Sequence, residues 1–242
     1  KELPSKMAGK PFAVNIITLD ENPFRDEQLA WINEIRPPFV VISAGSPHYA
    51  AEMQAQDMQV IYVTSDPELL EIAWEKNIEF VVLEGNEAGG HVGRQTTLTL
   101  GQAAQNLRSK NRKFSDKYVI LAGGIYNQSS LHRSAVLGAD GVQMGTIYLC
   151  SDEIVATGAM SQMYQQVVLE SQFGETTITG TSIGLMVRSI NSPKLKIIQN
   201  LESNTNKEDT TEDSARHQLE QASAGSLYVA AKCNDPKTGQ AL

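Results

Sequence analysis

The chain has 242 residues, of which 41% are apolar, so it is long enough and apolar enough for one large globular domain or two small ones. Its 20 basic and 28 acidic side chains give a net charge of −8 without any basic run, which argues against binding to nucleic acid or to an anionic membrane. No apolar stretch approaches the roughly 20 residues of a membrane-spanning helix, no signal peptide is recognisable, and Cys150 and Cys233 are the only cysteines, so we expect a cytoplasmic protein without structural zinc.

Short apolar runs rich in β-branched residues alternate with helical patterns along the first 150 residues. The runs predict strands at residues 12–18, 39–43, 60–64, 80–83, 118–121 and 141–144. Helices are expected at residues 27–35, 48–55 and 129–137, and a further one should begin near the Ser65-Asp-Pro-Glu68 capping sequence. Because the strands are apolar throughout, we expect a parallel sheet with both faces covered. This alternation predicts an α/β fold, either doubly wound or a (β/α)8 barrel of which six strands are readable.

The pattern changes after residue 151. Residues 153–172 are expected to form one long helix, and residues 189–204 are less regular. Residues 204–213 form a polar, acidic run that is typical of a solvated loop, and residues 214–222 are compatible with a helix.

A glycine-rich segment, Glu84-Gly-Asn-Glu-Ala-Gly-Gly-His-Val-Gly93, follows the fourth predicted strand. Its glycines let the backbone approach a ligand closely, and the carboxyl ends of parallel strands form the active-site face of α/β proteins. Histidine changes charge between pH 5 and 8, so His91 is a candidate general acid or base. The alternative is a turn with a structural or merely exposed histidine.

Two further strands each end in glycine, at Ala122-Gly-Gly-Ile125 and in Leu137-Gly-Ala-Asp-Gly-Val-Gln-Met-Gly-Thr146. The last two strands of a (β/α)8 barrel can hold a phosphate in this way, with free backbone amides and a helix N-terminus. The alternative is a pair of tight turns, but the order and spacing of the two motifs favour the phosphate site.

Two other residues deserve comment. Asn15 lies within the first predicted strand, where asparagine is disfavoured, so it either contacts a cofactor ring or is a locally satisfied polar group. Cys150 follows an apolar run and has no obvious activating base, so we do not expect it to be a nucleophile.

The ordered motifs Glu87–His91, Ala122–Ile125 and Gly138–Thr146 resemble those of the nitronate monooxygenase (2-nitropropane dioxygenase) family, which also includes FMN-dependent enoyl reductases of fatty-acid synthesis. The resemblance implies a (β/α)8 TIM-type barrel with non-covalently bound FMN over residues 1–190, followed by a helical or irregular extension over residues 191–242. Three segments look closer still to the flavin domain of bacterial type I polyketide synthases: Arg36–Phe39, Gly89–Gly93 and Met144–Leu149.

The resemblance also implies residue roles. His91 would be the catalytic acid or base. Contacts to the flavin would come from Asn15, Glu84, Gly89 and Gly90, and the FMN phosphate would be held at Gly123, Gly124, Gln143, Met144, Gly145 and Thr146. No metal ion is implied.

Three departures from the family pattern stand out. Nothing before Lys10 matches the family's first two strands, so we expect a fragment or excised domain that upstream sequence completes, because six strands of eight would leave open edges and an exposed apolar interior. Glu84 stands where the family often has glutamine, which would lower the flavin reduction potential unless the acid is protonated. Residues 176–193 and the acidic run do not match closely.

The expected activity is oxidation of nitronates by O2. The alternatives are an NAD(P)H-dependent enoyl-thioester reductase domain of a polyketide or fatty-acid synthase, and a non-catalytic flavin-binding domain. Substrates would be small molecules or acyl thioesters, and adjoining synthase domains or an acyl carrier protein are conceivable partners. A barrel resembling IMP dehydrogenase is disfavoured because neither cysteine lies in a suitable loop.

Overall fold

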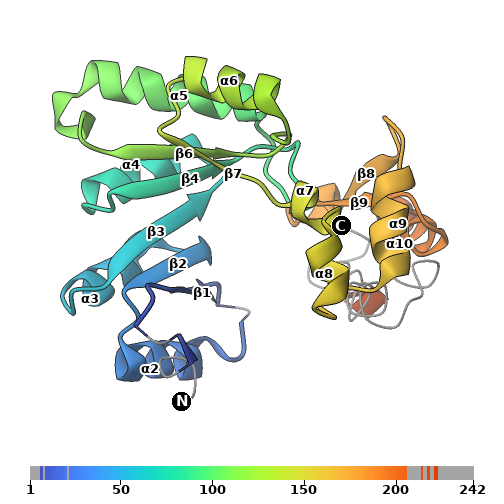
Figure 1. Ribbon diagram of the computed structural model, residues 1–242, viewed down its shortest axis with the longest axis horizontal. Coiled ribbons are helices and arrows are strands. Elements are labelled where there is room, and N and C mark those ends of the chain that lie inside the picture. Colours follow the sequence, from blue (N-terminus) through green and yellow to red (C-terminus); the bar gives the residue numbers. More distant parts are fainter. Residues whose placement is uncertain are drawn as a thin grey trace. The chain divides into compact units, whose positions relative to one another are not determined.

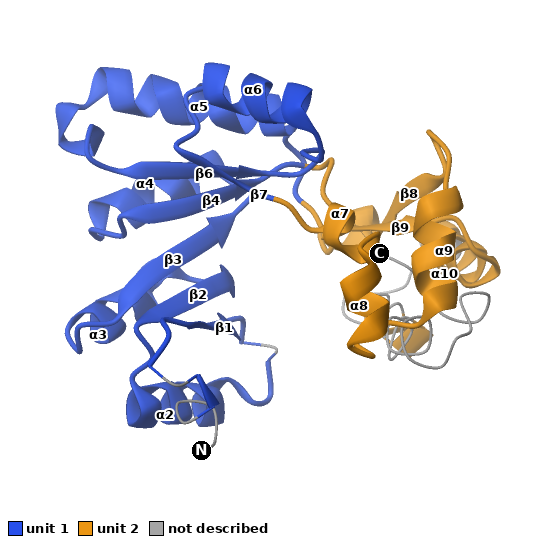
Figure 2. Cartoon of the chain, viewed as in Figure 1, with its two compact units in different colours: residues 1–85, 93–143 blue, residues 86–92, 144–242 orange. Residues whose placement is uncertain are grey.

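The computed structural model of the protein describes residues 6–7, 9–20, 22–205, 214, 217–218 and 221–222. The acidic run expected at 204–213 lies, beyond residue 205, outside the described residues. The described positions of the expected 214–222 helix are helical. Contacts divide the chain into two compact units, residues 1–85 with 93–143 and residues 86–92 with 144–242, coloured separately in Figure 2. The domain boundary expected after residue 190 stays a prediction.

The first unit is built on a six-stranded sheet. Its strands are β1 (Ala13–Ile17), β2 (Phe39–Ala44), β3 (Gln59–Thr64), β4 (Phe80–Glu84), β6 (Tyr118–Ala122) and β7 (Gly141–Gln143). They lie in the order β1-β2-β3-β4-β6-β7, and every neighbouring pair is parallel. All six strands predicted from the sequence are therefore confirmed within a few residues.

The strand order decides between the two predicted architectures. Each strand pairs with the next one of this sheet along the chain, so the order never reverses as it does in a doubly wound sheet. Because parallel crossovers are right-handed, a sheet that grows in one direction carries its helices on one face, as in a (β/α)8 barrel. Figure 1 shows α2 (Arg25–Ile35) beside β1 at one end of the sheet and α6 (Gln128–Val136) beside β7 at the other. The sheet is the barrel type, with six strands.

The two faces of the sheet are buried to different degrees, which corrects the expectation of two covered faces. On β2 and β3, Val40, Ile42, Val60 and Tyr62 are buried, whereas the residues between them, such as Val41, are only half-buried. The helices cover the face with the buried residues. The opposite face, with the half-buried residues, is the one that would line a barrel. In the described part of the chain, β1 and β7 are the outer strands of the sheet.

The remaining helices of this unit are η1 (Pro47–Tyr49), α3 (Ala50–Gln54), α4 (Pro67–Glu75), α5 (Thr97–Lys110) and η2 (Arg112–Phe114). The capping prediction for α4 is confirmed: the Asp66 carboxylate accepts the amide of Glu68 at 2.8 Å, and Pro67 occupies the first turn. Helix α5 was not expected. Its residues are mostly good helix formers, and the Thr96 hydroxyl caps it by accepting the Thr99 amide at 3.1 Å. At Gly101 an added Cβ would lie 3.2 Å from that of Leu137, so the helix packs closely there.

The second unit holds β5 (Gly90–His91), α7 (Thr146–Leu149), α8 (Asp152–Ala156), α9 (Gln162–Glu170), β8 (Thr176–Thr179), η3 (Thr181–Ile183), β9 (Val187–Ile190) and α10 (Pro193–Thr205). The single helix expected at 153–172 is wrong: Gly158, with φ +68°, follows the end of α8, and the Ser161 hydroxyl caps α9. Residues 189–204, expected to be less regular, contain the end of β9 and most of α10. Strands β8 and β9 form an antiparallel hairpin that β5 joins in the order β5-β9-β8.

None of the described helices is long and apolar enough to cross a membrane.

Arg108 of α5 ties the amino ends of β6 and β7 to this helix. Its guanidinium donates to the carbonyls of Gly138, at 3.1 Å, and Lys117, and it pairs with the Asp140 carboxylate, which also accepts the Val119 amide at 2.7 Å. The guanidinium carbon also lies 5.7 Å from the centre of the Trp74 ring.

Replacing this guanidinium should therefore be costly. We expect Arg108→Leu to lower the free energy of unfolding by about 2–3 kcal/mol, because it removes several charge-assisted hydrogen bonds and leaves their acceptors unpaired. Urea denaturation followed by circular dichroism measures this. The matched control is Arg112→Leu at an exposed position, which should change stability by less than about 0.5 kcal/mol. Equal stability of the two variants would contradict the role given to Arg108.

Candidate active site

The chemistry-bearing residues of the first unit lie at the carboxyl ends of its strands. The register aligns Glu84, the last residue of β4, with Ala122 of β6, and Ala122 with Gln143, the last residue of β7. Glu84 is half-buried and Gln143 is exposed. In parallel α/β folds this edge binds ligands, because the loops that follow the strands converge there.

Two consecutive glycines follow β6 directly, and both have left-handed backbones: φ is +100° at Gly123 and +67° at Gly124. The buried Thr97 hydroxyl stabilises this turn, since its oxygen lies 3.1 Å from the carbonyl of Ala122 and 3.0 Å from that of Gly123, and it donates to them. Within the described residues the amides of Gly123 and Gly124 have no acceptor. Such a turn forms a concave backbone surface that suits an anion.

A capping box precedes α6, the helix that follows this turn. Asn127 Oδ1 accepts the Ser130 amide at 2.9 Å, and Ser130 Oγ accepts the amides of Tyr126 and Asn127 at 3.0 Å each. This capping box leaves those three amides unavailable to a ligand. Among the described residues the two glycine amides are therefore free, whereas the amides of Tyr126, Asn127 and Ser130 around the start of α6 are occupied.

The segment after β7 passes from the first unit into the second. Gln143 belongs to the first unit, and Met144, Gly145 and Thr146 to the second. Gly145 is exposed and precedes α7, and a Cβ added there would meet no atom of the described residues within 4 Å. The space around this residue is open, as a ligand-binding backbone requires.

Glu84 differs electrostatically from the other carboxylates. Burial raises its pKa above the usual value for a glutamate. In the part of the chain that the structure describes, neither a hydrogen-bond donor nor a cation contacts its carboxyl group. Because nothing compensates the desolvation, the neutral acid, which can donate a hydrogen bond, is favoured to a higher pH than usual.

Asn15 lies on the same face of the sheet but in a different row. It is exposed on β1 and pairs with Val41, whose row continues through Ile61 to Phe80 of β4. Phe80 precedes Glu84 by four residues on the same strand. The register therefore places Asn15 nearer to the amino ends of the strands than the row of Glu84 and Gln143.

In the second unit, residues 86–92 carry the predicted histidine, and we call them the His91 loop. His91 is exposed and pairs with Val187 of β9, while Gly90, with φ +81°, pairs with Arg188. Gly89 is exposed as well. A backbone held by strand pairing with its imidazole in solvent leaves the ring accessible to a substrate.

Arg188 is a residue that the sequence analysis did not select. Its Nε and Nη2 donate to the carbonyl of Asn86 at 3.0 and 2.7 Å, and its Nη1 donates to the Thr176 hydroxyl at 2.9 Å. The one available signal was an arginine inside an apolar strand sequence, Val187-Arg-Ser-Ile190.

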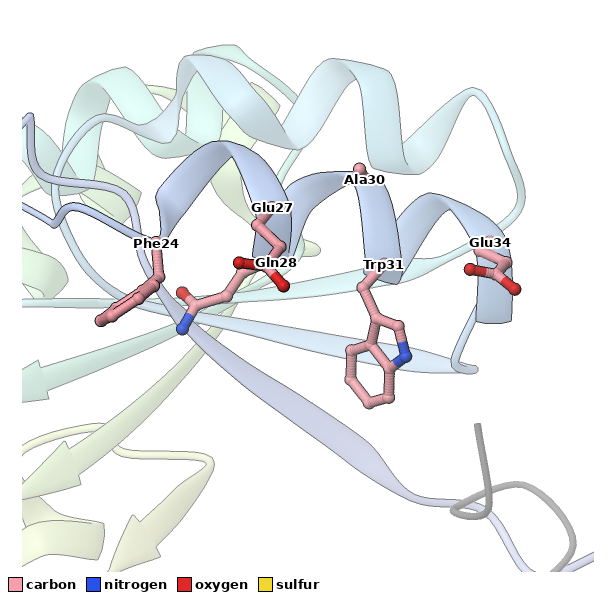
Figure 3. Close-up of a pocket in the computed structure, with 6 residues that line it drawn as sticks. All are labelled: Phe24, Glu27, Gln28, Ala30, Trp31 and Glu34. Carbon is pink, nitrogen blue, oxygen red and sulfur yellow. The ribbon is translucent and has the colours of Figure 1, made fainter.

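A depression of about 620 Å³ lies elsewhere, along α2. Figure 3 shows its lining residues, Phe24, Glu27, Gln28, Ala30, Trp31 and Glu34. The described part of its lining comes from this helix and the residue before it, whereas a ligand site buries most of its ligand. Among the described residues no group of three or more His, Cys, Asp or Glu side chains could hold a metal ion.

Comparison with known families gives one match over nearly the whole chain. The family described as "Nitronate monooxygenase" matches residues 4–238. The chain is 37% identical over 119 residues to a probable nitronate monooxygenase of Staphylococcus saprophyticus. The aligned region covers 47% of this chain and 32% of that protein. A probable nitronate monooxygenase of Bacillus subtilis is 32% identical over 119 residues, and that alignment covers 48% of this chain and 33% of that protein. The matched region thus spans about a third of these relatives.

Solved structures resemble nearly the whole chain. FabK from Thermotoga maritima superposes with a TM-score of 0.81 at 29% identity, covering 98% of this chain and 70% of that one. A nitroalkane oxidase from Streptomyces ansochromogenes gives 0.69 at 19% identity, covering 98% and 75%. The enoyl reductase domain of MlnA from Bacillus amyloliquefaciens gives 0.65 at 13% identity, covering 90% and 62%. The last two likenesses are evidence for the fold alone.

The raised pKa of Glu84 predicts a pH-dependent stability. An acid whose pKa is higher in the folded state stabilises the fold fully below its unfolded-state pKa, and this stability is lost as the pH rises through the folded-state pKa. We therefore expect Glu84→Gln to unfold at a higher temperature than the wild type at pH 8, with a difference that shrinks towards pH 4.5. Calorimetry of the ligand-free protein measures it. Glu71→Gln, at an exposed site, should show no such trend, and a difference that grows as the pH falls would refute the assignment.

Proposed function

Because the chain belongs to the nitronate monooxygenase family, we propose that it acts as an FMN-dependent oxidoreductase that oxidises nitronates with O2. The observation that supports this most is the pair of left-handed glycines with free amides directly after β6. Relatives named probable nitronate monooxygenases, at 32% and 37% identity, support the same substrate class. The histidine in an exposed strand of a glycine-rich loop supplies the acid–base group.

The residues present fit FMN. Backbone amides of Gly123, Gly124 and the 143–146 segment would hold its phosphate, since amides in a concave turn bind anions without a lysine or arginine. Glu84, Gly89 and Gly90 would lie against the ring, with Asn15 nearer to the amino ends of the strands. When bound, FMN would accept an electron from the nitronate and provide the reduced ring with which O2 reacts. The products would be a carbonyl compound and nitrite.

His91 would act on neutral nitroalkanes. Its imidazole would accept the proton from the carbon that bears the nitro group and so form the nitronate. The glycines beside it leave room for the substrate to approach the ring without side-chain obstruction. A substrate supplied as the nitronate has already lost this proton and needs no base.

An enoyl-thioester reductase is the second candidate. It is supported by the resemblance of the sequence motifs to a family that includes FMN-dependent enoyl reductases, and the fold is compatible with it because the enoyl reductase domain of MlnA shares that fold. NAD(P)H would then be the reductant, and His91 or water would supply the α-proton of the product. An acyl carrier protein or adjoining synthase domains would be the partners.

Anaerobic stopped-flow absorbance distinguishes the two activities. The proposed function predicts that a nitronate bleaches the bound flavin and that NAD(P)H does not. Bleaching by NAD(P)H alone would support the reductase instead. A flavin that neither compound reduces would favour a non-catalytic flavin-binding domain.

The role of His91 is tested by one variant on two substrates. We expect His91→Ala to lower kcat for a neutral nitroalkane by about 10²–10⁴-fold, the usual contribution of a general base, and to change turnover of the preformed nitronate much less. Nitrite release measures both. The control His132→Ala, at an exposed position of α6, should match the wild type. Equal loss on both substrates would contradict a base and indicate a binding role.

The proposed role of Gly124 in phosphate binding can be tested against a control glycine with the same backbone conformation, Gly158. Gly124 and Gly158 have φ values of +67° and +68°, so alanine is strained similarly at both positions. We expect Gly124→Ala to weaken FMN binding about tenfold or more, because a side chain strains the left-handed turn whose amides would hold the phosphate. Gly158→Ala should leave the Kd within twofold. Flavin fluorescence quenching gives the Kd, and similar values for both variants would remove Gly124 from the site.

A further inference from the structure

The hairpin of β8 and β9 is itself firmly anchored. At its turn Gly180, with φ +79°, tolerates no side chain, because an added Cβ would lie 2.0 Å from the carbonyl oxygen of Leu185. The Glu202 carboxylate of α10 accepts the amides of Gly180 and Ser182 at 3.0 Å each. The hairpin is therefore a fixed platform to which another segment can be attached.

The His91 loop is attached to this platform at both of its ends. At the far end, β5 pairs with β9, and the Val92 amide donates to the carbonyl of Met186 at 3.0 Å. At the near end the attachment is a side chain, the Arg188 guanidinium, with two of its nitrogens on the carbonyl of Asn86. A strand of two residues supplies little pairing of its own, so the guanidinium adds an attachment that the loop needs.

Arginine suits this task better than lysine does. Its planar fork lets Nε and Nη2 reach one carbonyl while Nη1 reaches the Thr176 hydroxyl at 2.9 Å, so the guanidinium joins the loop to β8 as well as to its own strand. A lysine ammonium could reach one of these acceptors but could not reproduce the fork. The side chain is half-buried, which limits competition from water.

We propose that Arg188 is a positioning residue, which fixes the His91 loop on the β8–β9 hairpin and thereby sets where the imidazole of His91 lies. The part of this proposal that concerns the role of His91 rests on the proposed function. The part that concerns the attachment of the loop does not. Arg188 touches neither the reacting atoms nor the cofactor in this account. Its effect is exerted through the Asn86 carbonyl and the backbone that leads to His91.

The attachment is tested by hydrogen exchange on the ligand-free protein. We expect Arg188→Gln to speed exchange of the amides of residues 90–92 at least tenfold and to leave those of β4 and β6 unchanged, with Arg188→Lys intermediate. Arg112→Gln removes the same charge at an exposed position and should exchange like the wild type. Unchanged exchange of residues 90–92 in Arg188→Gln would overturn the proposal. Faster exchange throughout would do so as well, because it would indicate general destabilisation.

The consequence for His91 is tested by kinetics. With a neutral nitroalkane we expect Arg188→Gln to lower kcat at least tenfold, with KM and the FMN Kd within threefold of the wild type and partial recovery in Arg188→Lys. With the preformed nitronate the loss should be smaller. A loss confined to KM would refute positioning of the base. A wild-type protein without FMN or turnover would contradict the proposed function, whereas the exchange experiment would still decide the attachment.

Discussion

Parallel pairing of strands in chain order is the constraint from which the rest of the structure follows. It brings the carboxyl ends of β4, β6 and β7 to one edge and aligns Glu84, Ala122 and Gln143 in one row. A slip of one residue would turn each of these side chains to the opposite face. The buried face of the sheet, with Val40, Ile42 and their neighbours under the helices, opposes such a slip. Packing on one face thus determines which groups reach the other.

Buried or half-buried polar groups from other elements contact the glycine-rich segments of both units. The Thr97 hydroxyl contacts the carbonyls of Ala122 and Gly123, and Arg188 contacts that of Asn86. The Thr97 hydroxyl binds carbonyl oxygens and leaves the amides of Gly123 and Gly124 free, and Arg188 binds a carbonyl oxygen and leaves the His91 imidazole exposed. This division lets a flexible sequence keep one conformation while it presents donors to a ligand.

Much of the fold could be predicted because the strands are short apolar runs bounded by glycine or proline. Helix α5 escaped prediction although Thr96 caps it, because Thr97, Thr99 and Gly101 are poor helix formers and weaken the helical pattern of its first half. The helix expected at 153–172 ignored Gly158, whose positive φ lies between two shorter helices. The loop motifs with His91 and Gly124 were visible from spacing. Arg188 was not, since its partner lies 102 residues away and is a backbone carbonyl, which carries no residue signature.

The central claim is that backbone amides at the ends of β6 and β7 hold the phosphate of a flavin nucleotide. The most direct measurement compares the Kd of FMN with that of riboflavin, which has the same ring and no phosphate, by fluorescence quenching at fixed ionic strength. The account predicts that one FMN binds per chain, at least tenfold more tightly than riboflavin. Equal affinity for the two, or binding of neither, would contradict it.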